Sequence, residues 1–476
     1  MTEKTPTVHF VSLGCPKNRV DSEVMLGVAK AEGYTHVTKP EEAEVIVVNT
    51  CGFIESAKAE SINTILELSA HKQGGQCKKL VMAGCLSQRY PQELADDMPE
   101  VDHFLGSSDM LKLGSVLRGN ADRMLVGNPA DWVVKATDPR TISTRGASAY
   151  VKIAEGCNRS CSFCVIPQLR GKQRSRTPDD VIREVEKLSA AGVLEINLVS
   201  QDTVAYGRDQ GGDRHALANL VERVANVPGI RWVRVFYLYP EKLDEHIIDV
   251  IANHERVVPY VDMPLQHAAD AMLRRMGRGH GGDRLRTLVD RLRTKITDLV
   301  FRTAFIVGHP GETDEEFTEL CDFVEWAEFD RVGVFHYSDE ETCQSRHLDG
   351  KVAPELAQER AATLMELQQD ISAEKHEALI GKKLEILVEG VSEESELVMR
   401  GRHAGQAPDI DGCVYLSGGP VSPGTMVHAT ISDATDYDLL GEVEDTLDPL
   451  PPPEVFSDHL VHRHSDGRRI SLKTVS

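Results

Sequence analysis

Cys157, Cys161 and Cys164 share one short segment, which Gly156 opens. Three thiolates with this spacing could each bind one iron of a [4Fe–4S] cluster. The fourth iron would then lack a protein ligand, and an open metal position is typical of a catalytic site. A structural zinc site would instead need a fourth ligand and usually paired cysteines, so zinc binding and plain core packing are the disfavoured alternatives.

Three other cysteines are far apart in the sequence, but each follows an apolar run that is typical of a buried strand. Taken singly, each would more often be a small buried hydrophobe. Parallel strands end at one edge of their sheet, where ligands bind. The shared placement therefore predicts a second three-cysteine cluster, on Cys15, Cys51 and Cys85. The other four cysteines show no such pattern and are assigned to core or surface roles: Cys77, Cys321, Cys343 and Cys413.

Two α/β domains are expected to position these cysteines. In residues 1–140, strand-like runs alternate with helical patterns, which predicts a parallel sheet covered on both faces. Residues 147–348 alternate in the same way, and six strand–helix units predict a partial (β/α)6 TIM-like barrel. The pattern alone does not distinguish that barrel from a doubly wound sheet. The six expected strands are 149–154, 195–200, 232–238, 259–263, 302–307 and 331–335.

The C-terminal part changes character. A long polar helix is expected over residues 354–380. Short alternating runs and many glycines over 381–444 then predict a small antiparallel β-barrel. The stretch 445–476 contains PLPPP and a polar end, which is typical of a linker and a flexible tail.

Composition limits the possible partners and the cellular location. The 476 residues include 53 Lys and Arg against 75 Asp and Glu, a net charge of −22. Such an acidic chain should not bind bare nucleic acid unspecifically, and a basic protein partner suits it better. We see no signal peptide and no membrane span, so we expect a cytoplasmic protein without membrane contact. In that compartment, ten cysteines are more typical of ligands or core residues than of disulfides.

Both cysteine sets together resemble the radical S-adenosylmethionine (SAM) methylthiotransferase family over about residues 8–444. That family combines an N-terminal cluster domain, a radical SAM barrel and a C-terminal TRAM β-barrel. It attaches a methylthio group to an unactivated carbon. The resemblance implies two [4Fe–4S] clusters, SAM and an electron donor. The motifs that carry it are SLGCPKN (12–18), NTC (49–51), EGC (155–157), RGK (170–172), PLQH (264–267) and GHPGET (308–313).

The resemblance also implies roles for particular residues. The catalytic cluster on Cys157, Cys161 and Cys164 would cleave SAM to a radical that removes hydrogen from the substrate. The cluster on the other three cysteines would present the methylthio sulfur. SAM contacts are expected from the loop aromatic and from two strand-end turns, at Phe163, Ser200, Gln201, Gly308, Pro310 and Gly311. The family's usual Glu-Gly-Thr-x-Ala is replaced here by ETCQ at 341–344.

Within the family, one bacterial branch modifies tRNA and another modifies an aspartate of ribosomal protein S12. Two segments, VIPQLRG (165–171) and APDIDG (407–412), resemble the sequences of the second branch more closely than those of the first. Residues 377–444 hold 13 acidic and four basic residues, a net of −9, which suits a basic protein partner. We therefore expect ribosomal protein S12 as the partner, free or in the small ribosomal subunit, and no direct nucleic-acid binding. Asp409 and Asp411 are candidate partner contacts or plain turn residues.

Two alternatives remain at this point. A tRNA adenosine methylthiotransferase would use the same scaffold, but it predicts a basic C-terminal barrel. A non-catalytic iron–sulfur electron carrier belongs to a different class, and it predicts four cysteine ligands for each cluster.

Overall fold

The first domain of the computed structural model is built on a parallel sheet with the strand order β2-β1-β3-β4-β5-β6. The structure describes residues 5–395, 398–419, 421–447 and 461–463. Strands β1 and β3 are buried on both faces, as their apolar sequences require. The strands are β1 Thr7–Leu13, β2 Thr35–His36, β3 Val45–Thr50, β4 Lys79–Gly84, β5 His103–Leu105 and β6 Met124–Leu125. The helices are α1 Pro16–Ala31, α2 Glu55–Ser69, α3 His71–Gly74, α4 Cys85–Arg89, α5 Pro91–Asp97 and α6 Leu113–Leu117.

The central domain is an open sheet of six parallel strands in the order β14-β13-β12-β11-β10-β7. This order follows the chain without reversal, whereas a doubly wound sheet reverses its order at a switch point. The expected partial barrel is therefore confirmed. Its strands are β7 Ser148–Lys152, β10 Glu195–Val199, β11 Trp232–Val235, β12 Val257–Asp262, β13 Val300–Val307 and β14 Arg331–His336.

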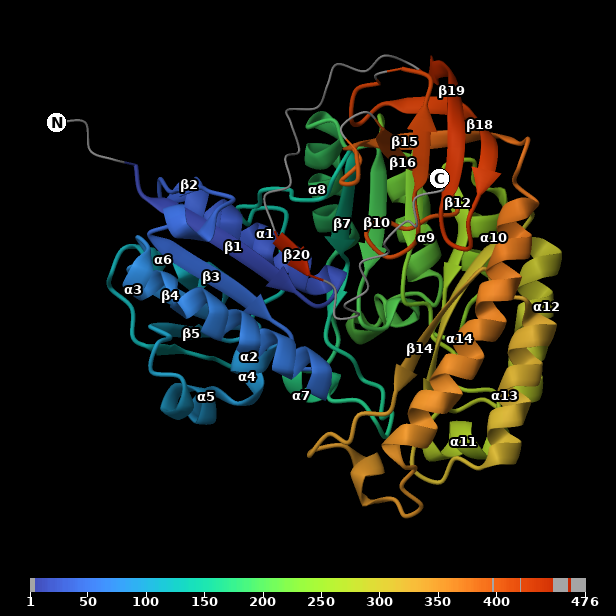
Figure 1. Cartoon of the computed structure of the whole chain (residues 1–476), viewed down its shortest axis with the longest axis horizontal. Coiled ribbons are helices and arrows are strands. Elements are labelled where there is room, and N and C mark those ends of the chain that lie inside the picture. The colour runs from blue at the N-terminus through green and yellow to red at the C-terminus, as the bar shows by residue number, and fades with distance from the viewer. Residues whose placement is uncertain (1–4, 396–397, 420, 448–460, 464–476) are drawn as a thin grey trace.

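Helices cover the outer face of this sheet, and a small hairpin carries the cysteine loop. The hairpin pairs β8 (Ala154–Glu155) with β9 (Arg174–Ser175). Figure 1 shows α12 and α13 lying outside the strands, on the side away from the first domain. The helices are α7 Ile166–Arg170, α8 Pro178–Ala190, α9 Ala216–Ala225, α10 Glu245–Asn253, α11 Asp270–Arg275, α12 Gly282–Lys295 and α13 Asp314–Ala327.

Helix α14 (Pro354–Glu377) leads from the central domain to a closed five-stranded barrel, as expected. Figure 1 shows this barrel in orange and red at the top of the view. Its pairings are antiparallel except between β17 and β19, which are parallel. Its strands are β15 Lys383–Val391, β16 Met399–His403, β17 Val414–Ser417, β18 Met426–Ala434 and β19 Leu439–Leu447.

The stretch expected to be a flexible tail, 445–476, falls only partly within the described residues. Strand β19 continues to Leu447, and β20 (Val461–Arg463) pairs in parallel with β1. The rest of that stretch lies outside the described residues. Among the described helices, none is long and apolar enough to cross a membrane.

A loop of the C-terminal barrel joins all three domains. The Tyr150 hydroxyl of the central domain donates a hydrogen bond to the Pro408 carbonyl, at 2.6 Å, and Tyr260 donates to Asp411, at 2.8 Å. Asp409 forms an ion pair with Arg19 in α1. Both aspartates therefore contact other domains of the same chain, a role that the sequence did not indicate.

Candidate active site

The three N-terminal cysteines lie at the carboxyl ends of three adjacent parallel strands. Strand β1 pairs with β3, and β3 pairs with β4 so that Thr50 lies opposite Gly84. Cys51 and Cys85 directly follow these two paired residues, and Cys15 follows β1 after one glycine. The sheet register therefore brings to one edge three thiols that are 34 or more positions apart in the sequence.

Close backbone approach brings two of these segments together. Gly14 has φ +87°, and a Cβ there would lie 2.9 Å from the Cys51 Cβ and 3.2 Å from its sulfur. Only glycine fits this position without strain. Burial, together with the nearby Cys85 and Cys15 thiols, raises the pKa of Cys51 to about 12. A raised pKa disfavours the thiolate and a bound metal ion favours it, which is how cysteine clusters hold iron.

An arginine of the central domain reaches the N-terminal cysteines. Arg170, the last residue of α7, donates from Nε to the Cys85 sulfur at 3.3 Å. Its Nη1 lies 2.6 Å from Asp21 in α1, and Asn18 Oδ1 lies 3.7 Å from the same sulfur. Burial raises the pKa of Cys85, and Arg170 opposes that rise. A guanidinium aimed at sulfur stabilises a thiolate, so this contact fits a cluster ligand.

The same arginine belongs to a buried network of charges between the first two domains. Lys152 lies 2.6 Å from Asp21 and also pairs with Glu155. Burial alone would raise the pKa of Glu155, but Lys152 and Arg170 lower it to about 2. Because Glu155 precedes the Gly156 cysteine loop by one residue, the network connects the surroundings of the two cysteine sets.

Replacing Arg170 with methionine should weaken the contact between these domains. Asp21 and Glu155 would each lose a buried cation partner, and breaking a buried pair costs about 3–5 kcal/mol. We expect a lower midpoint of thermal unfolding, measured by calorimetry on the cluster-free protein. Arg223→Met removes an exposed pair with Asp179 and is the matched control. An Arg170→Met midpoint equal to that of the control would contradict this account.

The second cysteine set lies on the loop between β8 and β9. Gly156 has φ +84°, and a Cβ there would lie 2.3 Å from the Lys172 carbonyl oxygen, so the position requires glycine. The Cys157 amide donates to the Gly171 carbonyl at 3.1 Å, which closes the base of the loop. Burial raises the pKa of Cys157 to about 11.

Residues after α11 support the rest of this loop. The Ser162 amide donates to the Met276 carbonyl at 3.0 Å, and Phe163 packs against a cluster that contains Met276. Arg278 Nη1 lies 3.7 Å from the Cys161 sulfur. Burial, with the other loop thiols nearby, also raises the pKa of Cys164. Each cysteine set thus has one arginine directed at a sulfur.

Within the described residues, no three His, Cys, Asp or Glu side chains converge on a single metal ion. A cubane cluster does not require such convergence, because each thiolate binds its own iron. The two cysteine sets, each with three thiols and an arginine directed at a sulfur, fit [4Fe–4S] clusters by the chemistry of their donors.

The strand-end residues expected to contact SAM lie in two environments. After β10, the Ser200 hydroxyl is 3.0 Å from that of Thr203. The Gln201 amide nitrogen donates to Glu155, while its buried Oε1 has no hydrogen-bond partner in the described part of the chain. That oxygen is available to a bound ligand beside the cysteine loop.

The glycine-rich turn after β13 is held by Glu312. The Gly308 amide donates to its carboxylate at 2.6 Å, and His267 and Arg360 lie 3.2 Å and 2.7 Å from the same group. A Cβ on Gly308 would lie 2.5 Å from the Ala357 Cβ of α14. Packing against that helix is therefore a reason for this glycine that the sequence did not reveal. Pro310 and Gly311 lie within the same turn, and the Gly311 amide donates to the Gly350 carbonyl at 2.7 Å.

Sequence reasoning missed the charged residues of the interdomain network, although one signal was present. Lys152 lies within the otherwise apolar run of β7, and a charge in a buried strand must have a partner. Cys343 was assigned to a core or surface role, and it is buried in a cluster with Cys85, Val165 and Leu169.

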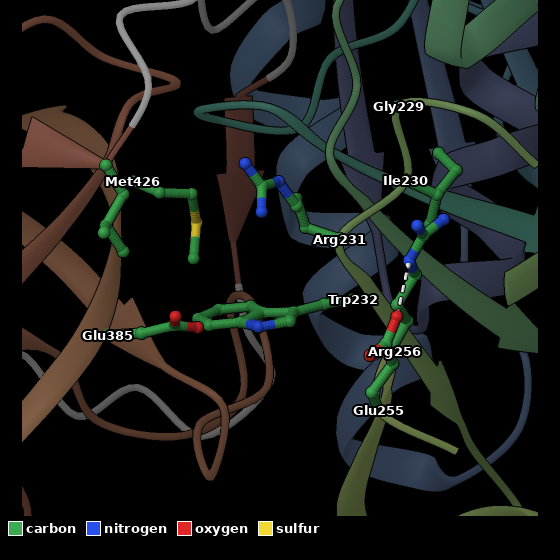
Figure 2. A pocket seen from close by; sticks show the side chains of 9 residues that line it. Gly229, Ile230, Arg231, Trp232, Glu255, Arg256, Glu385 and Met426 are labelled. Atoms are coloured by element: carbon green, nitrogen blue, oxygen red, sulfur yellow. Dashed lines mark ion pairs between the residues drawn. The ribbon is translucent and has the colours of Figure 1, made fainter.

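A cavity of about 330 Å³ lies elsewhere, between the central domain and the C-terminal barrel (Figure 2). Trp232, at the start of β11, forms one wall, and Glu385 and Met426 of the barrel lie across from it. Active sites of parallel barrels lie at the carboxyl ends of the strands, so this cavity is at the opposite end.

Comparison with known families matches each domain in turn. Residues 7–106 match the uncharacterized protein family UPF0004, residues 151–324 the radical SAM superfamily, and residues 380–443 the TRAM domain. Among solved structures, the radical SAM methyltransferase TsrM from Kitasatospora setae has a TM-score of 0.50 at 16% identity. It covers 69% of this chain, and 72% of its own chain is covered, which is a likeness of fold.

These domains and cysteine sites define a radical SAM methylthiotransferase, an enzyme class that implies a [4Fe–4S] cluster and SAM. A relative from Sorangium cellulosum, named ribosomal protein uS12 methylthiotransferase RimO, is 69% identical over 92% of this chain and 91% of its own. One of the same name from Anaeromyxobacter sp. is 47% identical over 94% of this chain and 96% of its own. The chain belongs to the RimO family.

Proposed function

We propose that this enzyme adds a methylthio group to the β-carbon of an aspartate in ribosomal protein uS12. The observation that carries the proposal is the pair of three-cysteine sets, whose surroundings are linked across a domain boundary because Arg170 contacts both Cys85 and Glu155. Two relatives that cover more than nine-tenths of the chain bear the name uS12 methylthiotransferase.

In this proposal Cys157, Cys161 and Cys164 hold the catalytic [4Fe–4S] cluster, and the N-terminal set, Cys15, Cys51 and Cys85, holds a second one. Bound clusters and SAM supply the radical and the methylthio sulfur in two SAM-dependent steps. Three loop thiolates would leave one iron of a bound cluster without a protein ligand, where SAM could bind. Beside the loop, SAM contacts are proposed for Phe163, Ser200 and Gln201, and across from it for Gly308, Pro310 and Gly311.

The surface of the C-terminal barrel suits a basic protein partner. Arg400 and Arg402 both pair with the buried Glu389, so neither presents a free charge. Several of its acidic side chains are exposed: Glu385, Glu393, Glu394, Asp433, Glu442 and Glu444. Of these, Glu393 pairs with Arg145 and Glu444 with the exposed Lys383, and Lys382 is exposed as well, so the acidic excess is carried by the others. An acidic surface attracts a basic ribosomal protein and repels the phosphates of tRNA. We propose that the enzyme acts in the cytoplasm with an external electron donor.

The test offers two substrates to the anaerobically reconstituted enzyme with SAM, sulfide and a reductant. Ribosomal protein uS12 is supplied in one reaction and unmodified tRNA in another, and mass spectrometry locates any methylthio group. We expect addition to an aspartate of uS12 and none to tRNA. Addition to tRNA alone would favour the tRNA branch of the family and contradict the charge argument.

A further inference from the structure

Lys17 is a buried cation at the boundary between the first two domains. It is the second residue after Cys15 and lies in the first turn of α1. Its exposed fraction is 8%, and its ammonium lies 3.3 Å from the centre of the Tyr237 ring in the central domain. The side chain therefore points from the N-terminal cysteine site toward the mouth of the central barrel.

No carboxylate of the described residues forms an ion pair with Lys17. Asp262, a carboxylate whose charge acts on Lys17, already has other partners: Arg302 lies 2.7 Å from one oxygen, and the Tyr237 amide donates to the other at 3.0 Å. Lys152, the other buried lysine at this boundary, has two carboxylate partners. A buried charge is normally paired. Within the described residues Lys17 has no carboxylate at ion-pair distance, although Asp262 and the Cys15 thiol both favour its charged form.

The residues around Lys17 connect both cysteine sites. Tyr237 follows β11, and Asp262 ends β12, so both lie at the carboxyl ends of barrel strands, where substrates bind. Tyr239 lies two residues after Tyr237 in the chain. Its ring is 3.9 Å from the Arg278 guanidinium, which is directed at the Cys161 sulfur. The short segment 237–239 thus runs from the Cys15 side of the site to the Cys161 side.

Tyr237 also has an unusual backbone. Its φ is +57°, a conformation that non-glycine residues adopt rarely and that clusters at functional sites. The Tyr237 side chain gives the ammonium an aromatic face and a neutral hydroxyl partner, neither of which carries a negative charge. An ammonium is a compact charge whose natural partner is an anionic oxygen.

We propose that Lys17 recognises the substrate by binding the side-chain carboxylate of the target aspartate. This inference rests on the proposed function and names a specificity residue for it. A carboxylate held at Lys17 places the adjacent β-carbon beside Cys15 and on the segment that leads to the Cys157–Cys164 loop. A carbon bound there would lie between residues that belong to the surroundings of the two cysteine sites.

The test compares binding of uS12 with binding of a variant in which the modified aspartate is replaced by asparagine. Dissociation constants are measured by anisotropy of labelled uS12 on the anaerobic, cluster-loaded enzyme. We expect the wild-type enzyme to prefer the aspartate protein by roughly 30-fold or more, the loss typical of truncating a buried charge pair. Lys17→Met should bind both forms with the same affinity, and Lys17→Arg should regain part of the preference.

Lys72→Met is the matched control, because it removes one positive charge from the same domain at a pair with Asp102, remote from the cysteines. It should keep the wild-type preference. Iron content and substrate-free SAM cleavage verify that each variant is folded and loaded. A Lys17→Met enzyme that keeps the preference, or that loses iron and SAM cleavage, would overturn the inference and leave the proposed function standing. If the wild-type enzyme modifies no aspartate of uS12, the proposed function itself fails, and the inference fails with it.

Discussion

Cys157→Ala is expected to abolish both methylthio transfer and the formation of 5′-deoxyadenosine from SAM. Cys157 is anchored by its amide to the Gly171 carbonyl, and its sulfur is the first of three on the loop. Two remaining thiolates cannot hold a cubane whose fourth iron must stay open. Chromatography of the SAM products under reducing conditions measures the effect, which should reach the level of the protein-free reaction.

Cys321→Ala is the control for this variant. Cys321 is half-buried in α13, packs against the core of the central domain and belongs to neither cysteine set. Its replacement should leave SAM cleavage unchanged. Normal 5′-deoxyadenosine production by Cys157→Ala would show that the loop does not hold the catalytic cluster.

Cys51→Ala is expected to separate the two halves of the reaction. This cysteine lies on the N-terminal sheet edge, and the loop of the central domain does not depend on it. SAM should still be cleaved to 5′-deoxyadenosine, while no methylthio group should reach uS12. Both products are measured in the same reaction by mass spectrometry.

The variant retains Cys15 and Cys85, and these two thiols could still hold part of an N-terminal cluster. Iron analysis addresses this point, because the loss should approach one cluster, about four iron atoms per chain. Full methylthio transfer by Cys51→Ala would contradict the role of the N-terminal set. If Cys51→Ala loses both SAM cleavage and methylthio transfer, the two sites are not independent.

The grouping of the cysteines into two sets could be predicted because the relevant signals were local. Each N-terminal cysteine follows its own strand by one or two residues, and parallel pairing then brings the three strand ends together. The loop cysteines need only their own spacing. The chain's sheets and the order of its domains follow from apolar runs that the structure buries.

The supporting charges could not be predicted because their partners lie in other domains. Arg170 and Asp21 are 149 residues apart, and Arg19 and Asp409 are 390 apart. No periodicity connects such positions. The same applies to Lys17, whose stacking partner Tyr237 lies on another domain and has a backbone conformation that no local pattern indicates.

Strand β16 is hidden from a hydrophobic pattern for a related reason. Its sequence, MRGRH, has no apolar alternation, since Arg402 occupies a buried position. That arginine is stabilised by Glu389 in the neighbouring strand and by Glu195, 207 residues away in the central domain. Hydrophobic patterns detect strands whose buried positions are apolar, and here the buried position holds an ion pair.

The most direct test of two independent cluster sites is the iron content of two triple variants. One replaces Cys157, Cys161 and Cys164 with alanine, and the other replaces Cys15, Cys51 and Cys85. After anaerobic reconstitution, the wild-type enzyme should hold about eight iron atoms per chain and each triple variant about four. Their Mössbauer spectra should add up to that of the wild type. A wild-type content of about four, with one triple variant unchanged and the other empty, would contradict the account.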